Sequence, residues 1–204
     1  MTRPDGGHRD DAPAGGGQDA GGGERARGEG RGDAGILVAI GANLPGLAGG
    51  AADACLNAVD ALRALPGLRV AAVSRWYESA PVPPSGQPPY VNGAVLLEPV
   101  AAMPDPATLL AGLQAIEAAF GRERGERNAA RTLDLDIVAM AEIVRDAPDP
   151  VLPHPRAHER SFVLLPVRDV SPRWTHPRLG RDVDALIRDL PREALAPAAI
   201  RLLA

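Results

Sequence analysis

The chain has 204 residues, a formal net charge of −4 and a single cysteine, Cys55. One cysteine excludes an intrachain disulfide and a multi-cysteine zinc site, and no apolar run approaches the roughly 18 residues that span a bilayer. All 22 basic residues are arginine, which excludes mechanisms that require a lysine, such as a Gly-Lys-Ser/Thr phosphate loop or a Schiff base. The acidic balance argues against a general nucleic-acid surface. Since no secretory signal is visible, we expect a cytoplasmic protein with no membrane partner.

The N-terminal part differs in composition from the rest. The first 35 residues hold 12 of the 23 glycines and no Ile, Leu, Val, Phe, Tyr or Trp. Such a segment cannot bury apolar surface, so residues 1–34 are expected to form a disordered, glycine-rich tail. Residues 35–204 are long enough for one domain with a hydrophobic core.

The first half of this domain predicts a strand, a helix and two further strands. Ile36–Ile40 is a short continuous apolar run typical of a buried strand, and turn residues follow it. Residues 51–65 carry apolar side chains at helical spacing before a Pro-Gly pair. Strands are expected over residues 68–78 and 90–98, and the loop of residues 81–89 between them is stiffened by five prolines.

The next segment predicts a helix and a strand. Pro106 can open a helix, and apolar residues continue at helical spacing to Gly121. The charged residues 122–130 read as a loop, and residues 132–140 as an alternating strand. The resulting order, βαββαβ, is that of a ferredoxin-like α+β sandwich with an antiparallel sheet.

The C-terminal part predicts an irregular extension. Residues 141–158 contain four prolines and cannot form one regular element. A short helix is expected from Ser161, ended by Pro166, and a second small helix over residues 183–190.

Two aspartates carry the strongest chemical signal. In the segment 131–137 (RTLDLDI), strand alternation would turn the leucines and isoleucine into the core and both Asp134 and Asp136 to the opposite face. Their Cα atoms would then lie about 6.5–7 Å apart, and the two carboxylates would repel each other unless a cation lay between them. Mg²⁺ is typically held by one or two carboxylates together with substrate phosphates. The alternative is an exposed strand face with two solvated aspartates.

An arginine-rich loop precedes these aspartates. Four arginines stand within ten residues: Arg122, Arg124, Arg127 and Arg131. Guanidinium groups bind phosphate oxygens bidentately, and beside two carboxylates they favour a transferase that uses a magnesium–nucleotide complex. Glu123 and Glu126 also allow part of the loop to pair internally.

Histidines and aromatic residues suggest the rest of a site. His154 and His158 are four residues apart, but Pro155 disfavours a helix there and no third ligand is near, so zinc is the weaker interpretation. A neutral His154 that donates to a phosphate or ribose oxygen is the better functional interpretation, and a surface histidine without a role is the alternative.

Aromatic residues can hold a planar heterocycle by stacking, and amides can bind its edge. Tyr90 and Asn92 share one face of an expected strand, and Phe162 stands further along the chain. The alternative is that the two aromatic rings are ordinary core residues.

Taken in order, these segments resemble the 6-hydroxymethyl-7,8-dihydropterin pyrophosphokinases over about residues 36–172. The matching strings are IGANL from Ile40, SRWYESAP from Ser74, YVN from Tyr90, GRER from Gly121, RTLDLDI from Arg131 and PHP from Pro153. The resemblance implies transfer of a pyrophosphoryl group from ATP to the hydroxymethyl oxygen of the pterin, with release of AMP.

The resemblance also implies roles for individual residues. Asp134 and Asp136 would hold two Mg²⁺ ions, and Arg122 and Arg131 would be catalytic with them. The implied ATP-binding residues are Gln114, Glu117, Arg124, Arg127, Ile137, His154 and Arg160. The implied pterin-binding residues are Ser79, Ala80, Pro81, Val82, Tyr90, Asn92 and Phe162, with Tyr90 and Phe162 on the two faces of the ring. The expected partners are these two small molecules, and the expected state is a monomer.

The sequence also departs from the family pattern. Asn128-Ala129-Ala130 stands where many members carry Trp-Gly-Pro, Ala42 and Ala80 replace a usual serine and a frequent proline, and Pro155 replaces a frequent aromatic residue. Because loop closure completes such sites, we expect altered substrate affinity rather than loss of chemistry. Two alternatives remain open: a non-catalytic ferredoxin-like module that binds nucleotide, and a magnesium–nucleotide transferase with another acceptor.

Overall fold

The computed structural model describes residues 35–46, 49–122 and 130–203, so the expected tail lies outside the described residues. The elements in chain order are β1 (Ile36–Ala42), α1 (Ala51–Arg63), β2 (Leu68–Val73), β3 (Tyr77–Ser79), β4 (Tyr90–Pro99), α2 (Pro106–Ala119), β5 (Asp134–Met140), the 3-10 helix η1 (Ala157–Glu159), α3 (Ser161–Val170), β6 (Thr175–His176), β7 (Arg181–Asp182), α4 (Val183–Asp189), the 3-10 helix η2 (Arg192–Leu195) and β8 (Ile200–Leu202).

The main sheet is antiparallel and follows the predicted topology. Its order is β5-β1-β4-β3-β8, and β2 also pairs with β4. Strands β1, β2, β4 and β5, with helices α1 and α2 as the two crossovers, form the βαββαβ core of a ferredoxin-like sandwich. The predicted fold class is therefore confirmed.

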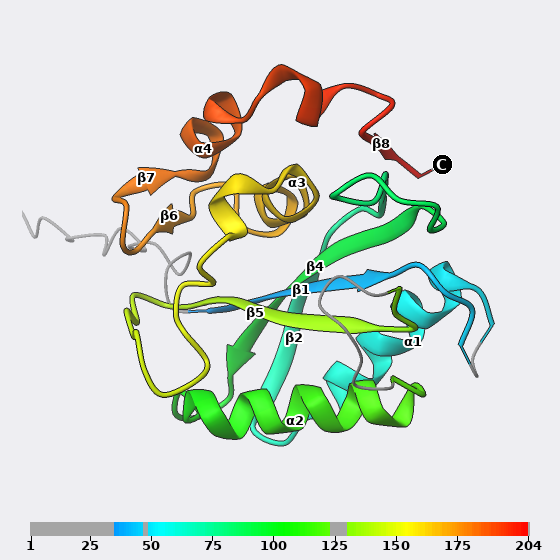
Figure 1. The fold of residues 1–204 in the computed structure, drawn as a ribbon. Helices are drawn as coiled ribbons and strands as arrows, with labels where there is room; N and C mark the ends of the chain where they lie inside the picture. The colour runs from blue at the N-terminus through cyan, green and yellow to red at the C-terminus, as the bar shows by residue number, and fades with distance from the viewer. Residues whose placement is uncertain (1–34, 47–48, 123–129, 204) are drawn as a thin grey trace, which may run out of the picture.

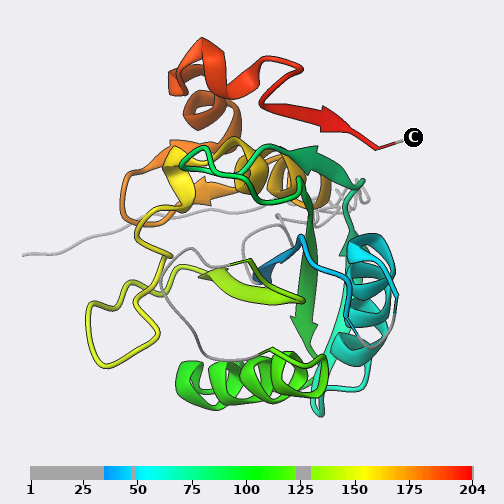
Figure 2. The same ribbon diagram turned by 45° about the vertical axis from the view of Figure 1, so that its right-hand side comes forward.

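Helices cover both faces of the sheet (Figures 1 and 2). Helices α1 and α2 lie on one face, over a core that includes Ile36, Val38 and Ile40 of β1. Helix α3 lies on the other face, with α4 packed against α3, and Leu37 and Val138 of the sheet belong to the core that these helices share. In the part of the chain that the structure describes, no helix has the length and apolar character to cross a membrane.

The strand expected over residues 68–78 is in fact two strands. Strand β2 pairs with the second half of β4 and β3 with its first half, and residues 74–76 interrupt the ladder between them. At the interruption Ala94 N donates to Ser74 Oγ (2.8 Å), so a side chain takes the place of a backbone acceptor. The Trp76 ring lies against Gly93. Side-chain chemistry at Ser74 thus breaks a run that strand periodicity alone treats as continuous.

The C-terminal part contains more regular structure than expected. Pro166 does not end α3, which continues to Val170 because Val167 and Val170 remain buried against the sheet. That burial offsets the one backbone hydrogen bond that proline removes. The hairpin of β6 and β7, and strand β8 on the edge of β3, were not predicted because each strand is only two or three residues long.

Replacing Gly93 by alanine tests the interruption between β2 and β3. A Cβ atom at position 93 would lie 2.6 Å from Trp76 Cε3, too close for a carbon–carbon contact. Gly93→Ala should therefore lower the free energy of unfolding by about 1–3 kcal/mol, as overpacking does, and lower the Tm in a thermal denaturation. Gly86→Ala is the control, because nothing lies within 4 Å of a Cβ atom there. An equal Tm for the two variants would contradict the packing of Trp76.

Candidate functional site

The register of the sheet places the key polar residues in one row. Gly41 of β1 stands opposite Asp134 of β5 on one side and opposite Asn92 of β4 on the other. Directly opposed residues point to the same face of a sheet, so Asp134 and Asn92 face the same side across a glycine. Ala39 is likewise opposite Asp136. Because Gly41 and Ala39 are small, β1 leaves space above the centre of the sheet, between the aspartates of β5 on one side and Asn92 of β4 on the other.

A cavity of about 680 Å³ lies over this row. Every predicted site residue in the described part lines it except Ile137: Ser79, Ala80, Pro81, Val82, Tyr90, Asn92, Gln114, Glu117, Arg122, Arg131, Asp134, Asp136, His154, Arg160 and Phe162. The Ile137 side chain is buried on the opposite face, in the core under α1 and α2, which follows from strand alternation with Asp136. Arg124 and Arg127 lie outside the described residues.

The half of the cavity that carries the charged side chains is built around Asp134. Arg131 Nη1 binds Asp134 Oδ2, and Arg122 Nη1 lies 2.8 Å from Asp134 Oδ1. Arg122 also pairs with Glu117, whose Oε1 accepts a hydrogen bond from Leu135 N (2.7 Å). Burial raises the pKa of Glu117, although Leu135 N and Arg122 oppose the shift. Helix α2 thus fixes one end of a carboxylate–guanidinium network on strand β5.

Asp136 is held less tightly. Its Oδ2 lies 3.8 Å from His154 Nε2, and 43% of its side chain is exposed. Desolvation, followed by repulsion from Asp134, raises the pKa of Asp136. Desolvation also lowers the pKa of His154, so the imidazole is neutral near pH 7. Asp136 is therefore a carboxylate that the protein leaves available in the cavity.

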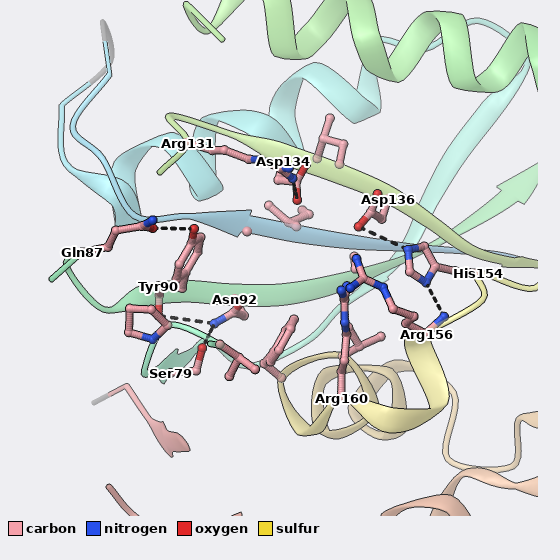
Figure 3. A pocket seen from close by; sticks show the side chains of 18 of the residues that line it. Ser79, Gln87, Tyr90, Asn92, Arg131, Asp134, Asp136, His154, Arg156 and Arg160 are labelled. Carbon is pink, nitrogen blue, oxygen red and sulfur yellow. Dashed lines mark hydrogen bonds and ion pairs between the residues drawn. The ribbon is translucent and has the colours of Figure 1, made fainter. Parts of the chain in front are cut away.

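The opposite end of the cavity carries aromatic and amide groups (Figure 3). Figure 3 shows Tyr90 and Asn92 at one end and His154 at the other, with the two aspartates between them. Asn92 Nδ2 donates to Ser79 Oγ (3.0 Å), which fixes the orientation of the amide. Because the nitrogen is committed to Ser79, the carbonyl oxygen is the atom of Asn92 that remains to accept a hydrogen bond from a ligand.

Asn43, which was not predicted as a site residue, links the two ends of the cavity. It is only 3% exposed. Its Oδ1 accepts a hydrogen bond from Arg131 N (2.8 Å), and its Nδ2 donates to Gln87 Oε1 (3.1 Å). Gln87 Oε1 also accepts from the Tyr90 hydroxyl (3.1 Å). One buried amide therefore connects Arg131 with the proline-rich loop and, through Gln87, with the Tyr90 ring. The turn after a buried strand was the sequence signal that could have found it.

Another wall of the cavity comes from the residues that flank η1 and from the start of α3. Arg160 lies over the Phe162 ring, with Cζ 5.5 Å from the ring centroid. Arg156, also not predicted as a site residue, lines the cavity beside it. Among the described residues, the cavity therefore carries four arginines, one histidine and three carboxylic acids: Arg122, Arg131, Arg156, Arg160, His154, Glu117, Asp134 and Asp136.

This donor set suits a hard divalent cation together with phosphates. Asp134 and Asp136 supply carboxylate oxygens on one face of β5, which are ligands that Mg²⁺ prefers. Among the described residues, no group of three histidine, cysteine, aspartate or glutamate side chains is arranged to hold a metal. Two protein carboxylates are what a magnesium site needs when substrate phosphates and water provide the other ligands.

Comparisons with known proteins agree with this chemistry. The family described as 7,8-dihydro-6-hydroxymethylpterin-pyrophosphokinase (HPPK) matches residues 37–172. Two relatives are named 2-amino-4-hydroxy-6-hydroxymethyldihydropteridine pyrophosphokinase. The one from Synechocystis is 35% identical over 81% of this chain and 80% of its own length. The one from Pseudomonas aeruginosa is 39% identical over 78% of this chain and 94% of its own length.

Among solved structures, wild-type HPPK-DHPS of Plasmodium falciparum is similar in fold. It aligns with a TM-score of 0.55 at 12% identity, over 75% of this chain and 44% of that chain. At this identity the similarity concerns the fold alone, and it supports the ferredoxin-like assignment.

The raised pKa of Asp136 predicts a stability change. A carboxyl group whose folded-state pKa lies above its unfolded value costs folding free energy when it ionises, so its contribution to stability falls as the pH rises through that window. Asp136→Asn should therefore raise the Tm of the ligand-free protein near pH 7, measured in the presence of a chelator, and the gain should shrink toward pH 4. Glu142→Gln, on the surface, is the charge-matched control. A Tm that falls at pH 7 would contradict the crowding of the two carboxylates.

Proposed function

The chain belongs to the 7,8-dihydro-6-hydroxymethylpterin-pyrophosphokinase (HPPK) family, and from this membership we propose how its cavity divides between the two substrates. The enzyme transfers pyrophosphate from ATP to the hydroxymethyl group of 6-hydroxymethyl-7,8-dihydropterin, a step of folate biosynthesis. The observation that carries the division is the position of Asp134 and Asp136 midway between an aromatic–amide end and a guanidinium–imidazole end.

In this proposal ATP occupies the end with the charged groups. Arg122 and Arg131 are the catalytic arginines, and the nucleotide also contacts Gln114, Glu117, Arg124, Arg127, His154 and Arg160, with Ile137 contributing only through its backbone. Arg122 and Arg131 now neutralise Asp134. When ATP binds, their guanidinium groups pass to phosphate oxygens, which they can bind bidentately.

Asp134 and Asp136 are the proposed Mg²⁺ ligands, and the proposed number of ions is two. When bound, Mg²⁺ neutralises charge on the phosphates and orients them for in-line displacement. The support for this assignment is the pair of carboxylates on one face of β5. Within residues 35–46, 49–122 and 130–203, the only ion-pair partner of Asp136 is the His154 imidazole at 3.8 Å.

The pterin occupies the other end. Tyr90 and Phe162 hold the faces of the ring, Asn92 accepts a hydrogen bond from its edge, and residues 79–82 close its side. The support is that all of these residues line one cavity and that Ser79 already orients the Asn92 amide. Such a planar, polar ring needs both stacking and edge recognition.

The proposed reaction is an in-line attack of the hydroxymethyl oxygen on the β-phosphorus of ATP. The new oxygen–phosphorus bond forms on the pterin, and the bond from the β-phosphorus to the bridging oxygen of AMP breaks. AMP leaves with that oxygen, and the hydroxyl proton passes toward Asp134, the only acceptor that we assign. Arg122 and Arg131 stabilise the charge that develops on the phosphoryl oxygens.

We also infer a single domain over residues 35–204 that acts as a monomer in the cytoplasm. The support is that one chain supplies every described wall of the cavity and that both cores share one sheet.

Product analysis tests the function directly. Incubation with Mg-ATP should release AMP, resolved from ADP by chromatography, only when 6-hydroxymethyl-7,8-dihydropterin is present. Asp136→Asn should remove most turnover while the protein stays folded. ADP as the product would contradict pyrophosphoryl transfer, and binding of both substrates without turnover would favour the non-catalytic module.

Arg131→Ala tests the proposed catalytic arginine. Loss of a preorganised cation at the reacting phosphates should lower kcat by about 100-fold or more. The Kd of the pterin, measured by calorimetry, should change little, because Arg131 serves the phosphate side. Arg131→Lys should recover only part of the rate, since an ammonium group keeps the charge but lacks the planar pair of parallel N–H donors with which guanidinium binds two oxygens side by side. A defect confined to pterin binding would contradict this role.

A further inference from the structure

Two arginines of the cavity wall lack the carboxylate partners that the other two have. Arg122 and Arg131 both pair with Asp134. Within residues 35–46, 49–122 and 130–203, neither Arg156 nor Arg160 forms an ion pair within 4 Å, although both line the cavity. Figure 3 shows both side chains reaching from the α3 side into the cavity, toward the face that carries Asp136.

The crowding of positive groups here is electrostatically unfavourable without a ligand. Burial and then the nearby Arg156 lower the pKa of Arg160. An anion bound between the two guanidinium groups would relieve the repulsion between them, as a phosphate does when two arginines share it.

The backbone holds Arg156 in place independently of its side chain. Arg156 N donates to His154 Nδ1 (3.1 Å), and His154 N donates to Val138 O of β5 (2.8 Å). Ala157, the next residue, is fully buried against the α3 core. The Cα atom of Arg156 is therefore anchored to the sheet, while its exposed side chain is free to follow a ligand.

We propose that Arg156 is a further nucleotide-binding residue, whose guanidinium group acts with Arg160 to bind the polyphosphate of ATP. This inference rests on the proposed division of the cavity, because it assigns the His154 end to ATP. Arg156 acts on binding of the phosphate chain rather than on the pterin, since the stacking residue Tyr90 and the amide of Asn92 lie at the other end.

The test measures whether the loss of nucleotide affinity caused by replacing Arg156 depends on the phosphate groups of the nucleotide. In calorimetry with Mg²⁺ and a non-hydrolysable ATP analogue, Arg156→Gln should raise the Kd roughly tenfold, the size expected for one charge-assisted contact. The Kd for adenosine and the KM for the pterin should stay unchanged. Arg156→Lys should recover part of the affinity, since it keeps the charge. Arg173→Gln, which removes an exposed arginine outside the cavity, is the matched control.

The outcomes separate this inference from the function itself. An unchanged Kd for the ATP analogue, or an equal loss for adenosine, would overturn the role of Arg156 while AMP release by the wild-type enzyme still stood. Production of ADP by the wild-type enzyme would overturn the function, whatever the Kd of Arg156→Gln. The Tm of each Arg156 variant should equal that of the wild type, because the Arg156 side chain is exposed. An equal Tm shows that a change in Kd does not come from unfolding.

Discussion

The pairing of β1 with β5 and β4 is the constraint on which the rest of the site depends. Its antiparallel register sets Asp134, Gly41 and Asn92 in one row across three strands. A shift of one residue would turn the aspartates into the core and Leu135 and Ile137 into the cavity, because side chains alternate faces along a strand. The apolar residues that fill the core under α1 and α2 therefore also fix the direction of the carboxylates.

The site keeps unfavourable charge that a well-packed fold has no reason to keep. Asp134 and Asp136 share a face, and Arg156 and Arg160 crowd together. In our proposal, Mg²⁺ bound at the two aspartates and phosphate bound at the two arginines would lower the free energy of the complex relative to the free protein. Stability would then be given up locally so that bound ligands complete the charge balance, which is the usual relation between stability and activity at such sites.

Asn43 joins the two halves of the site through uncharged hydrogen bonds. Its carbonyl oxygen holds the backbone of Arg131, and its amide holds Gln87, which also binds the Tyr90 hydroxyl. The two ends of the cavity, which we propose bind the pterin and the phosphates, are thus linked by one buried side chain. Buried polar networks of this kind are costly unless every member is satisfied, and this one is satisfied from three different segments of the chain.

Local patterns in the sequence determined much of this protein. Strand periodicity placed both aspartates on one face, helical spacing placed Glu117 at the end of α2, and the element order gave the ferredoxin-like topology, because each depends on neighbours within a few residues. The tertiary structure alone decided which residues meet. Ser74 splits one expected strand through Ala94, and Pro166 stays inside a helix because the sheet buries it. Asn43 meets Arg131 and Gln87, which lie far from it along the chain, and the fold brings Arg156 to the cavity wall. Such contacts depend on long-range packing, which no local pattern of residues specifies.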